Sequence, residues 1–194
     1  MANGVLAFRF KGFKSWGQNP EFLFFGGNSE LRGYEYLQFI GHKAFFADVE
    51  LRYPMIDAAL TPLGTIGGLR GVLFFNIGGG VFNNQDFRPF VSQTEAVPLF
   101  LGYDQDPIFG IPIPVYGPDI PVSGFRLVDS QASYGIGLQT SLLGFPMHFD
   151  WAWKTRFNRL YEDVLFYAAG AQVNMSGAVL YRRVKFQFWI GYDF

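Results

Sequence analysis

Residues 42–53 alternate between apolar and polar side chains along the whole length of a predicted β-strand. One face carries aliphatic and aromatic side chains, namely Phe45, Ala47, Val49, Leu51 and Tyr53. The other face carries polar and charged side chains, namely His42, Asp48, Glu50 and Arg52. A period of two is typical of a strand whose two faces meet different environments. The sequence therefore predicts a sheet with one apolar and one charged face.

The same alternation recurs elsewhere, and it predicts six antiparallel strands at residues 4–13, 42–53, 70–82, 133–144, 146–156 and 185–194. Prolines and glycines in 54–69 indicate a connection with one short helical turn. Two longer segments, 83–132 and 157–182, are predicted to be loops, the second with a short strand near 164–168. The first holds seven of the eleven prolines and shows no sustained period. We expect no domain boundary, so residues 1–194 form one segment.

Composition favours a membrane setting for this sheet. Aromatic residues make up 20% of the chain and charged residues only 16%, against about 25% in soluble domains. With 24 glycines and no cysteine, the alternating strands fit an outer-membrane β-barrel. A soluble β-sandwich with an aromatic core is the alternative. The net charge of −1 argues against nucleic-acid binding, and no apolar run is long enough to predict a transmembrane helix.

The sequence predicts no catalytic centre, metal site or cofactor. The serines lie in no Gly-x-Ser-x-Gly motif, and the glycine clusters are not followed by a predicted helix. His148 and Asp150 could begin a metal site, but no third ligand is visible, so a solvated polar residue is the favoured interpretation of His148. We therefore expect a protein that is not an enzyme.

Six strands are too few for a single-chain membrane barrel, which needs at least eight. An open sheet edge in hydrocarbon leaves backbone groups unpaired at a cost of several kcal/mol each. We expect a C-terminal piece of a longer barrel, with a signal peptide upstream. Assembly with other chains, or further strands within 83–132 and 157–182, would also supply the missing pairing. Because outer-membrane barrels have short periplasmic turns and long outer loops, the connections 14–41, 83–132 and 157–182 are predicted to face outward.

Four motifs resemble the BamA/TamA outer-membrane barrels, the bacterial surface antigen family. They are Gly-Gly-x-x-x-Leu-Arg-Gly-Tyr at 26–34, Glu-Leu-Arg-Tyr-Pro at 50–54, Phe-Phe-Asn-Ile-Gly at 74–78 and a final strand ending in Phe. The similarity covers nearly the whole chain and corresponds to the last six strands of a sixteen-stranded barrel. The residues of three further stretches resemble those of a subgroup in which the barrel follows a TolB-like β-propeller.

The resemblance implies a loop that folds back into the barrel lumen and is locked there by its arginine. Carried onto this chain, the loop motif is Arg32, Gly33 and Tyr34, and the first wall carboxylate is Glu50. The second wall position is Asn76, where the family usually has Asp, so a charge-assisted contact becomes a neutral hydrogen bond of about half the strength. The alternative is that Arg32 lies exposed in the loop while Glu50 pairs with Arg52 or Lys43.

The resemblance also implies a signal in the last strand, which the assembly machinery reads and which lies at a lateral seam. Its residues here are Phe188, Ile190, Tyr192 and Phe194. The implied function is insertion, assembly or translocation of proteins at the bacterial outer membrane. The implied partners are membrane lipids, unfolded outer-membrane proteins and assembly subunits, and no nucleic acid. Two other functions stay open: a passive barrel that anchors a propeller or passes small solutes, and a soluble lipocalin-like carrier.

Overall fold

The computed structural model describes residues 4–28, 30–61, 64–106, 109–142, 144–169 and 177–191. Its contacts divide the chain into two compact units. The first contains residues 1–87, 129–154 and 184–194, and the second contains residues 88–128 and 155–183. No helix among the described residues is both long enough and apolar enough to cross a bilayer.

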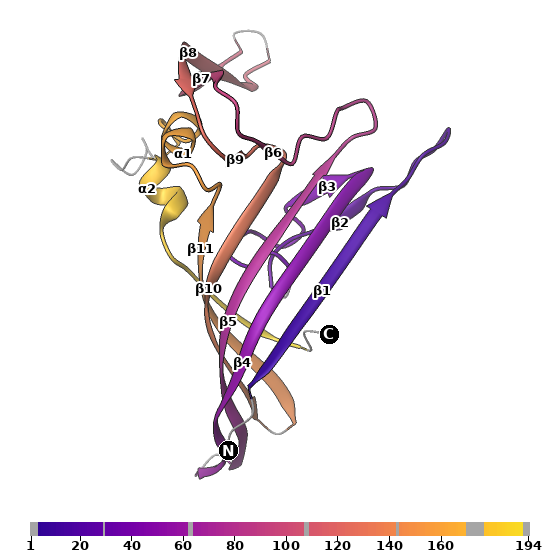
Figure 1. The fold of residues 1–194 in the computed structure, drawn as a ribbon, viewed down its shortest axis with the longest axis vertical. Coiled ribbons are helices and arrows are strands. Elements are labelled where there is room, and N and C mark those ends of the chain that lie inside the picture. Colours follow the sequence, from indigo (N-terminus) through magenta and orange to yellow (C-terminus); the bar gives the residue numbers. More distant parts are fainter. Residues whose placement is uncertain are drawn as a thin grey trace. The chain divides into compact units, whose positions relative to one another are not determined.

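The first unit is built on a six-stranded antiparallel sheet with the order β1-β4-β5-β10-β11-β12 (Figure 1). Its strands are β1 (Val5–Lys14), β4 (Lys43–Thr61), β5 (Gly64–Val81), β10 (Ser130–Leu142), β11 (Phe145–Thr155) and β12 (Lys185–Ile190). All six strands predicted from alternation are therefore present, and the all-β antiparallel fold class is confirmed. A short hairpin, β2 (Leu23–Phe25) and β3 (Phe39–Gly41), lies at the two ends of the connection after β1.

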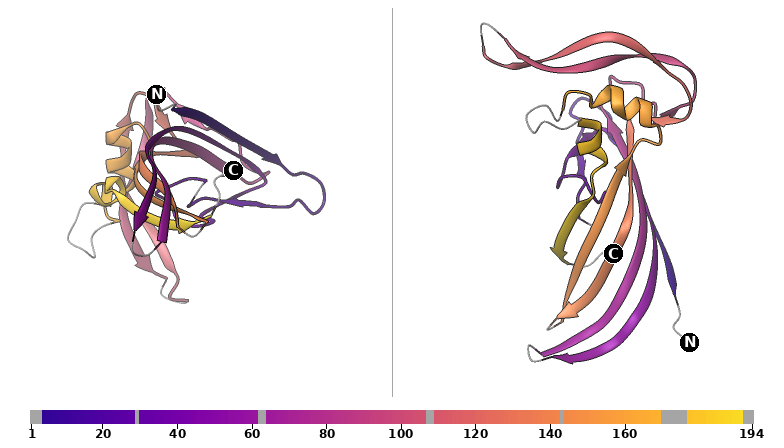
Figure 2. Two further views of the ribbon diagram at one scale, coloured as in Figure 1. Left: turned by 90° about the horizontal axis from the view of Figure 1, so that it is seen from below. Right: turned by 90° about the vertical axis from the view of Figure 1, so that its left-hand side faces the viewer.

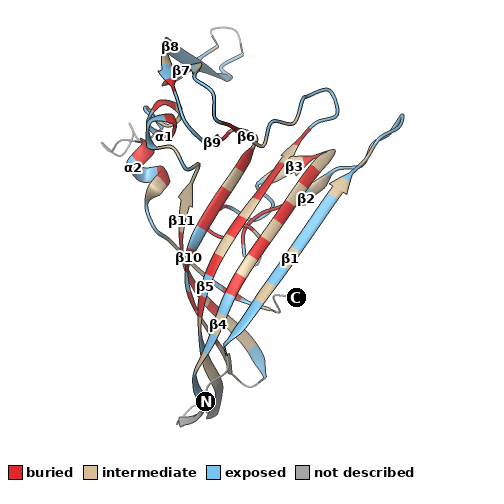
Figure 3. Cartoon of the chain, viewed as in Figure 1, coloured by how far each residue is buried: buried red, intermediate tan, exposed pale blue. Residues whose placement is uncertain are grey.

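On this sheet the polar face is buried and the apolar face is exposed, which is the reverse of a sheet in a soluble protein. Polar side chains on β4, β5, β10 and β11 are almost fully buried, namely Asp48, Glu50, Asn76, Ser133, His148 and Asp150. Apolar side chains on the same sheet are exposed, namely Phe8, Phe10, Leu51, Leu73, Ile136 and Phe188. The alternation is visible along the central strands (Figure 3). A soluble lipocalin-like carrier would have the opposite arrangement.

The predicted connection at 54–69 was wrong, because β4 continues to Thr61 and β5 begins at Gly64. Pro54 lies next to a register shift between Pro54 and Ile56, where the ladder can accommodate a residue that has no N–H. The glycines at 78–80 produce no such shift in the β4–β5 register. A side chain at Gly79 would instead collide with the backbone at Asp129 and Ser130, so this glycine permits a close backbone approach.

The second unit holds regular structure where the sequence predicted irregular loops. Residues 83–132 contain β6 (Phe90–Val91), β7 (Glu95–Gln105), β8 (Pro112–Val122) and β9 (Arg126–Leu127). These form two separate two-stranded sheets, β6 with β9 and β7 with β8, and none joins the six-stranded sheet. The β7–β8 hairpin was not predicted, because its prolines interrupt the alternation of apolar and polar residues. They are tolerated because every strand of a two-stranded sheet is an edge strand.

The short strand predicted near 164–168 was also wrong, because the chain there forms α1 (Arg159–Leu165), and α2 (Gly177–Arg182) follows. Asn158 caps α1, its side chain accepting a hydrogen bond of 3.0 Å from the Tyr161 N–H. Tyr161 and Val164 pack with Val97 and Val122 in the core of this unit.

A buried arginine organises the polar part of the second unit. Arg126 is fully buried, donates to the carbonyl oxygens of Gln93, Val122 and Gly124, and forms an ion pair of 2.9 Å with Glu95. Burial raises the pKa of Glu95, but hydrogen bonds from Arg88 and Arg126 and the charges of these arginines outweigh it, so the pKa lies below its ordinary value.

Candidate functional site

The connection between β2 and β3 folds back against the concave face of the sheet (Figure 2). Gly26 and Gly27 begin this segment with φ angles of 123° and 75°, in the left-handed region that favours glycine. A side chain at Gly27 would lie 2.8 Å from the Cα of Tyr36, so the two arms of the loop approach more closely than any other residue allows. Leu31 is fully buried by this turn.

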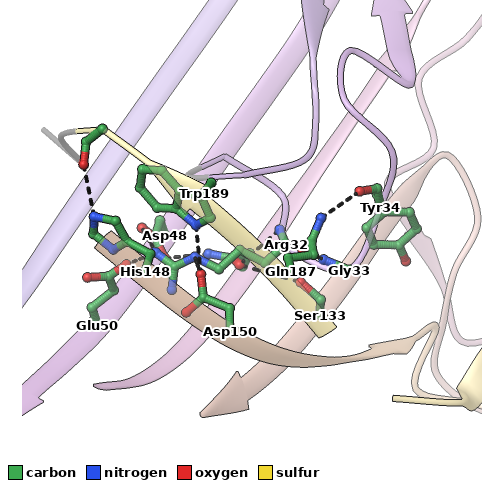
Figure 4. A network of polar contacts seen from close by, with 12 residues as sticks. Arg32, Gly33, Tyr34, Asp48, Glu50, Ser133, His148, Asp150, Gln187 and Trp189 are labelled. Carbon is green, nitrogen blue, oxygen red and sulfur yellow. Dashed lines mark hydrogen bonds and ion pairs between the residues drawn. The ribbon is translucent and has the colours of Figure 1, made fainter. Parts of the chain in front are cut away.

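Arg32 belongs to this loop, and its side chain is surrounded by three carboxylates of the sheet (Figure 4). Its Nη2 donates a hydrogen bond to Glu50 on β4. Nη2 lies 3.9 Å from Asp48 on β4, and Nε lies 3.7 Å from Asp150 on β11. The guanidinium carbon is 4.3 Å from the centroid of the Phe74 ring, which adds a cation–π contact. Only 1% of the arginine side chain is exposed.

The amide of Asn76 contacts Arg32 through the backbone of the arginine. It does not hydrogen-bond the arginine head group; its Oδ1 accepts a hydrogen bond of 3.3 Å from the backbone N–H of Arg32. Its Nδ2 donates to Asp48, its register partner on β4. Asn76 therefore binds the loop backbone and a wall carboxylate at once, which an aspartate could not do because it has no donor when ionised.

Arg32 and the charged side chains around it form a cage in which acidic and basic groups pair with one another. The ion pairs around Arg32 join three acidic side chains, Asp48, Glu50 and Asp150, to three arginines, Arg9, Arg32 and Arg52. Arg52 contacts Glu50 at 2.7 Å, and Arg9 lies 3.9 Å from Asp48. A buried charge without a partner costs several kcal/mol, so this balance is what allows so many ionised groups to be buried together.

Gly33 and Tyr34 continue the loop along β10 and β11. Gly33 has a φ of 86°, and a side chain there would lie 3.1 Å from the Cβ of Ala152. The Tyr34 hydroxyl donates a hydrogen bond of 3.1 Å to the carbonyl of Ala132, and its ring lies 5.7 Å from the Lys154 ammonium. The two residues after the arginine thus fix where along β10 and β11 the loop contacts the sheet.

The last strand binds the same loop from its inward face. Gln187 accepts a hydrogen bond of 2.5 Å from the Gly33 N–H, and its Nε2 donates one of 3.2 Å to the Tyr34 carbonyl. Lys185 forms an ion pair of 2.5 Å with Glu35. The hydrogen bond from Lys185 and its charge lower the pKa of Glu35 from its ordinary value, against a smaller opposing effect of burial.

Trp189 connects the last strand to the arginine cage. Its indole N–H donates a hydrogen bond of 2.9 Å to Asp150, on the same carboxylate oxygen that faces Arg32. The His148 ring stacks on the indole at 3.7 Å between centroids, and its Nε2 lies 2.9 Å from the Gly191 carbonyl oxygen. His148 is only 4% exposed, so the interpretation of a solvated residue was wrong.

Two residues of the implied C-terminal signal, Phe188 and Ile190, lie on the opposite face of β12. Phe188 and Ile190 are 48% and 58% exposed, and the Phe188 ring contacts that of Phe149 on β11 at 5.1 Å. Tyr192 and Phe194 lie outside the described residues. The role of this strand as a signal stays a prediction.

A sheet with buried charges on its concave face and exposed aromatic residues on the other is that of an outer-membrane β-barrel protein. The sequence matches the Omp85 superfamily domain over residues 3–194. The chain belongs to this superfamily, whose members insert or translocate proteins at the outer membrane. Searches of curated proteins and of solved structures return no significant match, and the subgroup with a TolB-like propeller stays a prediction.

Proposed function

We propose that this chain supplies the C-terminal strands of a barrel that inserts or translocates proteins at the bacterial outer membrane. The observation that carries the proposal is the buried Arg32 cage, which holds the loop of residues 26–38 against three strands of the wall, β4, β5 and β11. A brace of this kind would keep the remaining strands in register while one seam of the wall opens.

In this proposal the loop and the last strand have different tasks. The loop lock consists of Arg32, Gly33 and Tyr34 with Glu50, Asp48 and Asn76 on the wall. The strand β12 is an edge strand of the described sheet and pairs with β11 over only six residues. A short edge strand separates at lower cost than the long pairs of the wall, because fewer ladder hydrogen bonds break. We propose that its free edge is where an unfolded outer-membrane protein enters the membrane.

The test uses the full-length protein reconstituted in lipid vesicles, with an unfolded outer-membrane protein as the substrate. The measurement is the rate at which the substrate becomes resistant to protease and shows heat-modifiable gel mobility. Vesicles with the protein should accelerate this step over empty vesicles, and Arg32→Ala should remove most of the acceleration. The matched control is Arg70→Ala, which removes an exposed arginine from β5. Equal rates with and without the protein would overturn the proposal.

A further inference from the structure

The inward face of β12 contacts the loop and the wall carboxylate that faces the loop arginine. Three alternate residues share this face: Lys185, Gln187 and Trp189. Lys185 pairs with Glu35 of the loop, Gln187 binds two loop backbone groups, and Trp189 holds the carboxylate of Asp150 that faces Arg32. Each inward side chain of the last strand thus contacts either the loop or its arginine cage, and Figure 4 shows this for Gln187 and Trp189.

Gln187 makes the most specific of these contacts. Its amide uses one acceptor and one donor on the N–H of Gly33 and the C=O of Tyr34, as the backbone of a neighbouring strand would. Both loop groups are backbone atoms, so the contact depends on the path of the loop and not on the loop's side chains. An amide side chain carries its donor and its acceptor on two separate atoms, so it can bind both backbone groups at once.

From these contacts we infer that β12 and the Arg32 loop form one coupled latch, with Gln187 and Trp189 as positioning residues. Separation of β12 from β11 removes the support of the loop, and release of the loop removes the inward contacts of β12. Coupling of this kind is reciprocal, because a free-energy term shared by two elements affects both equally. The inference rests on the proposed role of the loop and adds a mechanism by which opening of the last strand unlocks it.

The outward face of β12 provides an independent way to hold the strand. Phe188 contacts Phe149 at 5.1 Å and Phe186 contacts Trp151 at 5.2 Å between ring centroids. These pairs stabilise the pairing of β12 with β11 from the other face of the sheet. Substitutions on the inward face can therefore weaken the latch while the outward pairs keep the strand attached.

The first arm of the test is Gln187→Glu in the full-length protein reconstituted in lipid vesicles. Glutamate retains an acceptor for the Gly33 N–H but loses the donor to the Tyr34 carbonyl. Tryptic cleavage after Arg32 reports release of the loop, since this arginine is buried in the docked state. We expect cleavage to become faster by about tenfold, as for loss of one hydrogen bond to a buried group. The matched control is Gln105→Glu, the same change at an exposed position of β7.

The second arm measures the reverse direction. Glu35→Gln removes the partner of Lys185 at an exposed loop position, so the barrel should still fold. Amide hydrogen exchange within 186–190 should become faster, while exchange within 44–51, where β4 is paired on both sides, should stay unchanged. Arg32→Lys should give a larger increase of exchange within 186–190.

The two arms together decide the inference. Faster cleavage in Gln187→Glu and faster exchange in the loop variants establish the latch. Unchanged cleavage in Gln187→Glu would overturn it, and so would unchanged exchange of β12 in both loop variants. These outcomes are independent of substrate insertion, so the latch can fail while the proposed function holds, and the reverse.

Discussion

Arg32 is the residue on which the largest single effect is expected. Arg32→Ala would leave Asp48, Glu50 and Asp150 buried with one cation fewer, and removing one member of a buried ionic network typically costs about 3–5 kcal/mol. Arg32→Lys should recover part of this loss, because an ammonium keeps the charge but cannot reach two carboxylates with a planar fork. The measurement is urea unfolding in lipid vesicles, and a loss below about 1 kcal/mol for Arg32→Ala would contradict the matched cage.

Asn76 offers a sharper test of the charge balance. Asn76→Asp would place a fourth carboxylate in register with Asp48 and remove the donor between them, so we expect a loss of about 1–3 kcal/mol. Asp48→Asn combined with Asn76→Asp restores one amide and one carboxylate at this pair. The double variant should be more stable than Asn76→Asp alone, and strict additivity in the double-mutant cycle would contradict the account.

Gly33 tests how closely the loop approaches the wall. Gly33→Ala must adopt a φ of 86° and place its methyl group 3.1 Å from the Cβ of Ala152. Strain at such a position costs about 1–3 kcal/mol, and the loop can relieve it by moving away from β11. We expect faster tryptic cleavage after Arg32, whereas Gly110→Ala, at a positive φ with open space around it, is the matched control.

At the level of single residues, the sequence predicted part of the site. Family resemblance placed Arg32 and Glu50 opposite each other, and the structure brings these side chains into contact; their role as a lock stays a prediction. Asp48 stood on the predicted charged face but had no assigned partner. Asp150, Gln187 and Trp189 could not be assigned to the cage, because their proximity depends on which strands curve around the loop, and local periodicity contains no such information.

At the scale of single elements, we expect the short helix α1 of the second unit to depend on its N-cap, Asn158. Asn158→Ala removes the acceptor for the Tyr161 N–H, a change that typically costs about 1 kcal/mol of helix stability. Hydrogen exchange within 161–166 should become faster by several fold. Exchange in the six-stranded sheet should stay the same, and a global loss of stability would contradict a local role.

The hairpin of β7 and β8 should respond to acid through Glu95. The pKa of Glu95 lies below its ordinary value of 4.5, so the carboxylate stabilises the folded state at higher pH. This contribution is lost as the pH falls below 4.5 through the folded pKa. The protection factors of the β7 amides, which correct for the intrinsic pH dependence of exchange, should therefore fall in this acidic range in the wild type. Glu95→Gln should remove the pH dependence, and an unchanged profile would show that another group is responsible.

Strand existence was predictable because alternation persists through each of the six strands of the sheet. Strand ends were not, since Pro54, Gly64 and Gly67 are typical of a connection and yet lie in the ladder. The helix α1 was missed although Asn158 and the buried Tyr161 and Val164 have helical spacing, because seven residues are too few for a periodic signal. Tertiary packing supplies what a short helix lacks in intrinsic stability.

For the whole molecule, the exposed apolar face is expected to determine where the protein folds. Ile136 is 50% exposed on the outward face of β10. Ile136→Arg should cost up to about 2–4 kcal/mol in a bilayer, depending on its depth, because a lipid-facing charge loses its water. Ile136→Leu is the control, and the measurement is folding in lipid vesicles followed by heat-modifiable mobility. A variant that folds as well as the control would contradict lipid contact at this site.

The most direct test of the account is a scan of β5 with single cysteines in the full-length protein, since this segment contains no cysteine of its own. Spin labels at Leu73 and Phe75 and at the inward positions Val72 and Phe74 would be exposed in turn to molecular oxygen and to a water-soluble nickel complex. Oxygen, which concentrates in lipid, should reach the labels at 73 and 75, while those at 72 and 74 should be shielded from it. Access of the nickel complex to the labels at 73 and 75 would show that this face meets water, and would contradict a membrane barrel braced from within by the Arg32 loop.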